Sequence, residues 1–193
     1  MAVDERRTNT REQIRTVALE MFAERGYDGT SLREIAERLG VTKAAVYYHF
    51  KSKEDILASL LEDFVGRVDE LLEWAERQPR DVATRRSILE RYAELLSGRA
   101  SQLARFMQEG QPAIRELAAG IKMRERAARL FPLLVGEDAS LEAMLRAQLA
   151  FVSLHMGAFG AHLGKGQGFL AAADPAELRA AAVRVAAELV DAL

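Results

Sequence analysis

Side chains that can contact a nucleic acid are concentrated between Thr30 and Lys53. This segment, TSLREIAERLGVTKAAVYYHFKSK, places a lysine, two tyrosines and a histidine within one short stretch. The ammonium group of Lys43 can donate to the O6 and N7 acceptors of guanine in the major groove. Ala44 and Ala45 are small enough to approach a thymine methyl group. The chemistry of this segment is therefore that of sequence reading on DNA.

Two short helices joined by a tight turn are predicted to hold these side chains. Ser31 can cap the first helix as part of a capping box, and Thr42 can cap the second. Gly40 is suited to the left-handed conformation that ends the first helix. A helix-turn-helix also needs a small residue where its helices touch and a β-branched residue in the second helix, which Ala36 and Val46 supply. The pattern predicts a DNA-binding helix-turn-helix.

The segment resembles the DNA-binding domain of the TetR family of bacterial transcriptional regulators. The resemblance rests on three runs at the correct spacing, namely ALEMFAERGYDGTS, IAERLGV and VYYHFKSKEDIL. It covers residues 10–57, roughly a quarter of the chain. It implies an all-α protein with an N-terminal three-helix helix-turn-helix DNA-binding domain over residues 1–52. A helical ligand-binding and dimerisation domain would follow over residues 53–193.

The resemblance also implies particular contacts with double-stranded DNA. Tyr47 and His49 are expected to donate to phosphates, although Tyr47 could instead be partly core. Tyr48 is expected to meet bases or the sugar-phosphate edge, and Lys53 to clamp a phosphate. Arg33 is either a base or phosphate contact or an ordinary surface charge, and the capped helix N-termini favour anions. The predicted DNA-binding residues are Ser31, Arg33, Thr42, Lys43, Ala44, Ala45, Tyr47, Tyr48, His49 and Lys53.

Composition narrows the classes of protein that the chain can represent. It has 193 residues, no cysteine, three histidines and a net charge of −2. The sequence therefore offers no disulfide or thiolate site, and no nucleotide fingerprint or Ser-His-acid pattern indicates an enzyme. His155 and His162 lack a carboxylate that would complete a metal site. We expect no catalytic residues, no metal and no cofactor.

The charge distribution and the absence of long apolar runs bear on partners and location. Residues 1–53 carry ten Lys or Arg against eight Asp or Glu, which allows a local basic patch on an otherwise acidic chain. The N-terminal run MAVDERRTNTRE lacks the apolar core of a signal peptide. No uninterrupted apolar run reaches the about 18 residues of a membrane-spanning helix. We expect a cytoplasmic protein with no membrane partner.

Beyond the helix-turn-helix the sequence predicts only helices, since no period-2 strand pattern appears. Proline and glycine residues separate the predicted segments. The expected helices cover residues 52–78, 81–97, 100–109, 113–131, 140–163 and 175–192.

The helix predicted over residues 140–163 carries two stripes on opposite sides. One consists mostly of small residues, which let another helix approach closely, and the other of large apolar residues. The family pairs its last two helices with those of a symmetry mate, so we expect a two-fold homodimer on a palindromic operator. Alternatively, both stripes are core within one chain. The predicted interface residues are Ala143, Ala147, Ala150, Leu154, Gly157, Ala161, Leu178, Ala182 and Val185.

The resemblance further implies a pocket for a small-molecule effector. Aromatic, thioether and hydrogen-bonding residues on several helices form the mixture that such pockets use, although each of them could equally fill the core. An effector that binds the non-DNA-competent state more tightly would shift the population away from DNA. The candidate ligand-binding residues are Trp74, Tyr92, Leu103, Phe106, Met107, Met123, Phe131, Gln148, Phe151 and His155.

The function expected from the sequence is sequence-specific transcriptional regulation. A repressor released from a palindromic operator by a small-molecule ligand accounts for both predicted domains. The alternative is a ligand-independent architectural or protein-interaction module that uses the same DNA-binding element. The two hypotheses differ in whether any small molecule changes the affinity for DNA.

Overall fold

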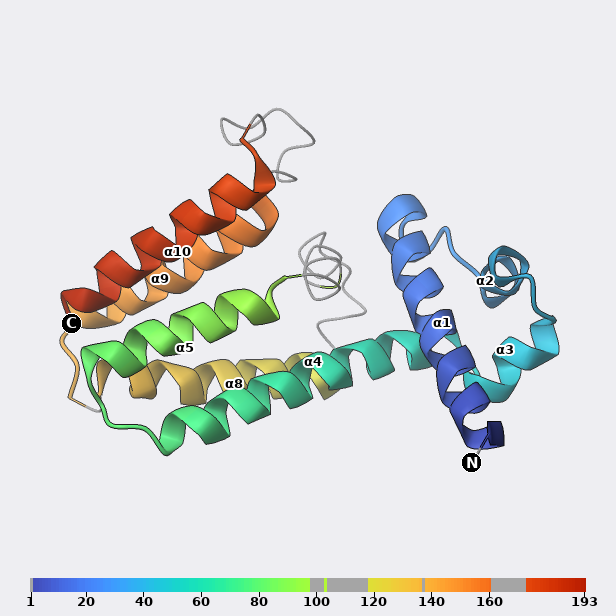
Figure 1. Ribbon diagram of the computed structural model, residues 1–193, viewed down its shortest axis with the longest axis horizontal. Coiled ribbons are helices and arrows are strands. Elements are labelled where there is room, and N and C mark those ends of the chain that lie inside the picture. Colours follow the sequence, from blue (N-terminus) through green and yellow to red (C-terminus); the bar gives the residue numbers. More distant parts are fainter. Residues whose placement is uncertain (1, 98–102, 104–117, 137, 161–172) are drawn as a thin grey trace. The chain divides into compact units, whose positions relative to one another are not determined.

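The computed structural model describes the chain except for residues 1, 98–102, 104–117, 137 and 161–172. Every regular element among the described residues is a helix (Figure 1), which confirms the all-α prediction. The helices form two compact units. Unit 1 contains Met1–Asp63, and unit 2 contains Phe64–Ser101 together with Ile121–Leu193.

Unit 1 consists of three packed helices and the first part of a fourth. Helix α1 (Ala2–Arg25) packs against α2 (Leu32–Leu39), which in turn packs against α3 (Lys43–His49). Helix α4 (Lys53–Glu76) begins in unit 1 and continues in unit 2, so the division lies inside this helix. The domain boundary between residues 52 and 53 therefore stays a prediction.

Apolar side chains of α1 form the centre of the core of unit 1. Ile14, Ala18 and Phe22, spaced at about one helical turn along α1, are each fully buried. The ring of Tyr27 lies 5.1 Å from that of Phe22, centroid to centroid, and closes the core at the end of α1. Burial of these side chains supplies the hydrophobic free energy that holds three short helices together.

The observed first helix is longer than the predicted one. In the sequence, Thr10 and Gln13 have the spacing of a capping box, which predicts a first helix that begins at Thr10, whereas α1 begins at Ala2 and Thr10 lies inside it. A Thr-to-Gln spacing of three residues recurs by chance in polar sequence, and it caps a helix only where the preceding backbone is extended. Here the preceding residues are already helical, so that prediction was wrong.

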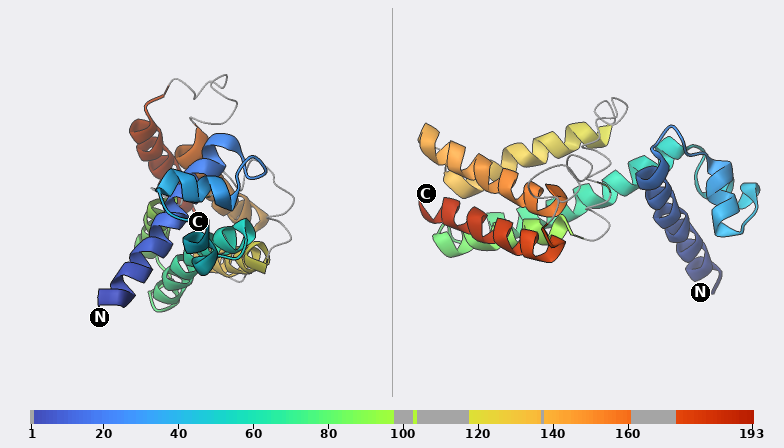
Figure 2. Two further views of the ribbon diagram at one scale, coloured as in Figure 1. Left: turned by 90° about the vertical axis from the view of Figure 1, so that its right-hand side faces the viewer. Right: turned by 90° about the horizontal axis from the view of Figure 1, so that it is seen from above.

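Unit 2 contains α5 (Val82–Leu95), most of α8 (Ala118–Val135), α9 (Leu141–Phe159) and α10 (Pro175–Asp191). Helices α9 and α10 lie side by side along their lengths, and α5 packs against both (Figure 2). A Cβ atom added at Gly157 would lie only 2.4 Å from the Cβ of Ala182. The glycine therefore permits the close approach of α9 and α10.

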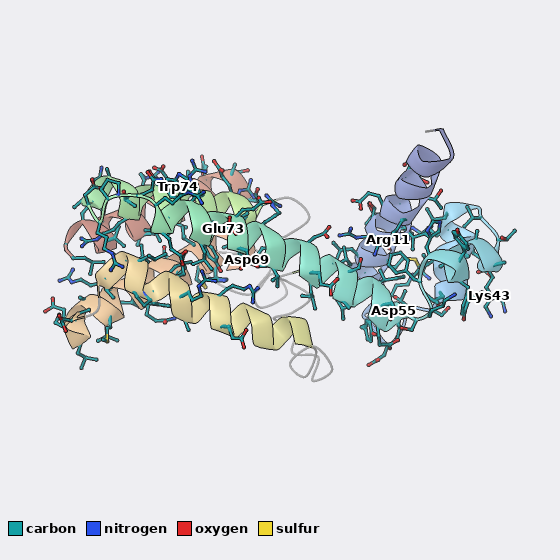
Figure 3. All side chains as sticks on the ribbon, turned by 90° about the horizontal axis from the view of Figure 1, so that it is seen from below. Arg11, Lys43, Asp55, Asp69, Glu73 and Trp74 are labelled. Atoms are coloured by element: carbon teal, nitrogen blue, oxygen red, sulfur yellow. The ribbon has the colours of Figure 1, made fainter. Side chains whose placement is uncertain are left out.

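Ion pairs join α8 to the part of α4 that belongs to unit 2. Arg126 donates to both carboxylate oxygens of Asp69, from Nε at 2.9 Å and from Nη2 at 2.8 Å. Arg129 pairs with Glu76 at 2.7 Å, about two helical turns further along α4. Figure 3 shows Asp69 on the part of α4 that this pairing involves. The bidentate pair is the stronger of the two, because its two parallel bonds fix the geometry and Arg126 is largely buried.

Helix α8 continues through the proline at which a break was predicted. Pro132 lies inside α8, and the helix ends at Val135. Gly136 follows with φ of +81°, a left-handed conformation that ends helices, and its N–H donates to the Pro132 carbonyl at 2.9 Å. The glycine rather than the proline therefore sets the end of the helix. Most of the helix expected over residues 100–109 lies outside the described residues.

Candidate nucleic-acid interface and effector region

The turn between α2 and α3 has the local geometry that the sequence predicts. The Ser31 hydroxyl accepts from the Glu34 N–H at 3.3 Å, and the Ser31 N–H donates to the Glu34 carboxylate at 2.9 Å. The Ser31 hydroxyl also donates to the Glu34 carboxylate at 2.7 Å, and the two donations from the Ser31 hydroxyl and N–H hold the pKa of the Glu34 carboxyl below its ordinary value. Gly40 has φ of +67°, which lets the chain turn sharply. Thr42 then caps α3 by accepting from the Ala45 N–H at 3.2 Å.

Helix α3 separates its side chains by character. Val46 is fully buried and Phe50, which ends the helix, is 3% exposed, so both anchor α3 on the core. Lys43, Ala44, Tyr47 and Tyr48 are exposed, and we call these four residues the reading face. Figure 3 shows Lys43 at the edge of unit 1, on the side away from α1. The polar and aromatic groups that can contact DNA are thus the ones left uncovered.

Two aromatic contacts organise the reading face. The Lys43 ammonium lies 5.2 Å from the centroid of the Tyr47 ring. The Tyr48 ring makes an edge contact with the half-buried His49 ring, at 5.2 Å between centroids and an interplanar angle of 86°. The two tyrosines, although adjacent in sequence, therefore have different neighbours.

Two of the predicted contacts are engaged within unit 1. Lys53 donates to the Tyr27 carbonyl at 2.8 Å, and its ammonium lies 4.1 Å from the Tyr27 ring centroid. Arg33 is exposed and donates to Glu37 at 2.8 Å, one turn further along α2. Each side chain has more donors than these bonds use, because an ammonium carries three N–H groups and a guanidinium five, so both can also donate to a phosphate.

Arg11 was not among the predicted DNA contacts. Its guanidinium lies 4.9 Å from the ring centroid of Phe50, next to the end of α3. Arg11 is exposed and so extends the basic character of this end of the helix-turn-helix. In the sequence, only the charge of Arg11 suggested a DNA contact. Its stacking on Phe50 could not be seen there, because the two residues lie 39 positions apart.

An aromatic cluster in unit 2 brings together four of the predicted ligand-binding residues. We use the name aromatic cluster for Tyr92, Phe131, Phe151 and His155. The Phe151 ring contacts the rings of Tyr92 and Phe131 at 5.0 and 5.1 Å between centroids. The Tyr92 hydroxyl lies 3.3 Å from Nε2 of His155, whose Nδ1 lies 2.7 Å from the Phe151 carbonyl oxygen.

The polar groups of this cluster are set in apolar surroundings. Burial of the Tyr92 phenol raises its pKa to about 12, because the charged form is disfavoured away from water. A neutral phenol and an imidazole in such a setting can supply directed hydrogen bonds to a largely apolar molecule.

The other predicted ligand-binding residues are dispersed or lie outside the described side chains. Trp74 is half-buried beneath the Arg91 guanidinium, 4.1 Å from its ring centroid, and Gln148 is exposed on α9. Leu103 is buried. Phe106, Met107 and the side chain of Met123 lie outside the part of the chain that the structure describes. Among the described residues there is also a shallow depression of about 150 Å³ between α4 and α5, lined by Arg67, Glu70, Leu71, Arg91, Glu94 and Leu95.

The small-residue stripe of α9 meets α10 of the same chain, whereas the predicted interface placed this stripe against a partner. The Ser153 hydroxyl donates to the Ala182 carbonyl at 3.0 Å, and Gly157 meets Ala182 at the closest point of the two helices. Such side chains cannot meet a partner, because their own chain covers them. Five of the predicted interface residues are buried within the single chain, namely Ala147, Ala150, Leu154, Gly157 and Ala182. Ala143 and Leu178 are half-buried, Val185 is 47% exposed, and Ala161 is outside the described residues.

The opposite side of α9 exposes large apolar side chains instead. Their exposed fractions range from 45% for Val152 to 74% for Leu141. We call the set on α9 the apolar face: Leu141, Met144, Leu145, Leu149 and Val152. Contiguous exposed apolar residues of this size mark interaction surfaces in monomeric proteins.

None of the described helices is long and apolar enough to cross a membrane. Within the same residues, no group of three or more His, Cys, Asp or Glu side chains could hold a metal ion.

Comparisons with known proteins agree with this geometry. Residues 14–60 match the family described as bacterial regulatory proteins, tetR family. Over 73 residues, 37% of this chain and 34% of the relative, the sequence is 42% identical to the HTH-type transcriptional regulator AcrR of Shigella flexneri. The chain spans about a third of the length of the first curated relatives that it matches.

The fold of known structures extends the similarity over most of the chain. A TerR/AcrR-family transcriptional regulator from Aquifex aeolicus is 22% identical with a TM-score of 0.68, covering 91% of this chain and 96% of that one. The transcriptional regulator FadR of Bacillus subtilis, solved in complex with stearoyl-CoA, is 20% identical with a TM-score of 0.62, covering 94% and 98%. At these identities the likeness concerns the fold alone.

Proposed function

We propose that this chain, which belongs to the TetR family of bacterial regulatory proteins, is a sequence-specific DNA-binding transcriptional regulator. The observation that carries the proposal is the reading face of α3, which exposes Lys43 and Tyr47 while Val46 and Phe50 anchor the helix from behind. A helix of this kind enters the major groove with its first residues against base edges. Phosphate contacts set the position of the protein, and Lys43 selects the sequence.

A homodimer is the assembly that we propose for DNA binding. The apolar face of α9 exposes five large apolar side chains, and an isologous two-fold interface would cover the same face on both copies. The interface that we propose is centred on Leu145, Leu149 and Val152, which are exposed in the single chain. Two reading faces related by a two-fold axis would then read a palindromic operator.

Repression controlled by a small-molecule effector is the regulatory mode that we propose. The aromatic cluster of unit 2 offers the combination of ring surfaces and hydrogen-bonding groups that a largely apolar ligand needs. That FadR of Bacillus subtilis was solved with stearoyl-CoA supports a ligand-binding role for this fold in general. Helix α4 contains residues of both units. A conformational change in unit 2 on effector binding can therefore be transmitted through this helix to the helix-turn-helix.

The proposed function is tested by selecting bound sequences from a random duplex library at a stated salt concentration. We expect recovery of one palindromic motif whose half-sites lie about one helical turn apart. The operator can then serve as a probe for effectors, scored by release of the protein. Recovery of no motif, with binding that disappears as salt rises, would contradict sequence-specific regulation and support the architectural alternative.

A further inference from the structure

The position of the Lys43 ammonium over the Tyr47 ring has a consequence for sequence reading. Lys43 is the first residue of α3 and Tyr47 lies four residues later, one helical turn along the same face. Side chains on a helix lean toward its N-terminus, so the Tyr47 ring reaches back over the Lys43 side chain. The ammonium lies 5.2 Å from the ring centroid, within the range of a cation–π interaction.

We propose that Tyr47 is a positioning residue for Lys43 and thereby determines the base specificity of α3. This inference rests on the proposed function, because it concerns the same DNA-reading site. A free lysine side chain has four flexible bonds and is a compact point charge with no preferred direction of its own. The Tyr47 ring holds the ammonium on one side of the helix before DNA is bound, which lowers the cost of ordering it against a base.

The neighbouring residues favour Tyr47 over the other aromatic residue of the face. Tyr48 is more exposed than Tyr47, at 61% against 38%, and its ring contacts His49 rather than Lys43. Lys51 donates to the backbone carbonyl of Tyr47 at 3.3 Å and so leaves the face of the ring to Lys43. Tyr48 therefore provides a matched control on the same helix.

This role separates the ring of Tyr47 from its hydroxyl. A phosphate contact needs the hydroxyl and carries no sequence information, so its loss weakens binding to all sequences alike. A positioning role needs only the ring, so it survives in Tyr47→Phe and is lost in Tyr47→Leu. The two roles are therefore distinguishable in a single series of variants.

The experiment measures the Kd of the selected operator and of duplexes with single base-pair changes. The proteins are the full chain and its variants Lys43→Ala, Tyr47→Phe, Tyr47→Leu, Tyr48→Leu and the double variant Lys43→Ala/Tyr47→Leu. We expect Tyr47→Leu to reduce discrimination at the base pair identified by Lys43→Ala by about two- to fivefold, the range of an exposed cation–π contact. Tyr47→Phe and Tyr48→Leu lose contacts of their own and so should bind every duplex more weakly, but both should retain the discrimination at that base pair. The double variant should match Lys43→Ala in its discrimination at that base pair.

Several outcomes would overturn the inference while leaving the proposed function intact. One is a Tyr47→Leu variant that loses affinity uniformly and keeps its discrimination. Others are an equal loss of discrimination in Tyr47→Phe or Tyr48→Leu, or a Lys43→Ala variant with unchanged discrimination at every base pair. A wild-type protein that discriminates at no base pair would instead contradict the proposed function itself. Circular dichroism of each variant, with Tyr47→Met as a second ring-free substitution, ensures that a misfolded helix is not scored as lost reading.

Discussion

The helix-turn-helix of unit 1 and the α9–α10 pair of unit 2 leave opposite kinds of side chain exposed. Helix α3 buries Val46 and exposes Lys43 and Tyr47, whereas α9 buries Ala147 and exposes Leu149. Both helices are amphipathic in the sense that one side meets the core. Their exposed side chains differ, and these side chains indicate the kind of partner. The exposed residues of α3 suit a polyanion, and those of α9 suit an apolar surface.

The small residues of α9 and the large ones serve separate contacts. The small stripe lets α10 approach closely within the chain, as Gly157 and Ala182 show. The large stripe stays exposed, and the dimer that we propose would cover it, since exposed apolar area costs about 25 cal/mol for each Å² that stays in water. In that dimer, close packing within the chain and association with a second chain would use opposite sides of one helix.

The largest expected effect comes from a charge in the apolar face. Leu149→Glu should abolish dimer formation, because a carboxylate buried in an apolar interface without a partner costs several kcal/mol. Sedimentation velocity across a concentration series would measure the shift from dimer to monomer. Glu142→Gln, on the same helix, serves as a control that should remain dimeric. A dimer that persists unchanged in Leu149→Glu would contradict the assignment of this face.

A substitution at the closest helix contact should have a smaller effect, on folding. Gly157→Ala places a Cβ atom 2.4 Å from that of Ala182, so the helices must move apart. We expect unit 2 to lose about 1–3 kcal/mol of stability, typical of overpacking. Thermal unfolding by circular dichroism would measure it, with Gly66→Ala, where the added Cβ meets open space, as the control. An unchanged midpoint would mean that α9 and α10 are less closely packed than observed.

Removing the reading lysine should affect binding while leaving the fold intact. Lys43→Ala should cost about 1–3 kcal/mol of specific binding and relax the preference at one base pair. Lys43 is exposed, so the unfolding midpoint should not change. Fluorescence anisotropy with the selected operator and its single-base variants would measure both quantities. A uniform loss over all sequences would instead assign Lys43 to a phosphate.

The stability of the aromatic cluster should depend on alkaline pH through Tyr92. Burial raises the pKa of Tyr92 to about 12, above its ordinary value of 10, so the folded state favours the neutral phenol. The resulting stabilisation is fully present below pH 10 and is lost as the pH rises through about 12. Chemical unfolding at several pH values should show a smaller decline for Tyr92→Phe than for the wild type over this window. An identical decline in both would contradict the buried setting of Tyr92.

The parts predicted correctly from sequence are those determined locally. The capping box of Ser31, the turn at Gly40 and the anchoring by Val46 depend on residues within a few positions of one another. The positions of Lys53 and Arg11 do not, because their aromatic neighbours lie 26 and 39 residues away in the sequence. Spacing alone therefore could not indicate that Lys53 lies against Tyr27.

The two stripes of α9 are a similar case. Periodicity identified both stripes of the helix, but it carries no information on which stripe meets α10 and which remains exposed. Which stripe meets α10 depends on how closely the two helices can approach. That distance is set by Gly157 and Ala182, which are 25 residues apart in the sequence. Pro132 is a further position at which the sequence pattern differs from the structure. Helix α8 continues through the proline and ends at Gly136 instead.

The most direct test of two separate surfaces is the mass of the protein–DNA complex. Native mass spectrometry of the wild type on its selected operator should give two chains per palindromic duplex. Leu149→Glu should give one chain on a single half-site, with much weaker binding but the same preferred bases. A wild-type complex with one chain per operator, or a Leu149→Glu variant that still binds as a pair, would contradict the account.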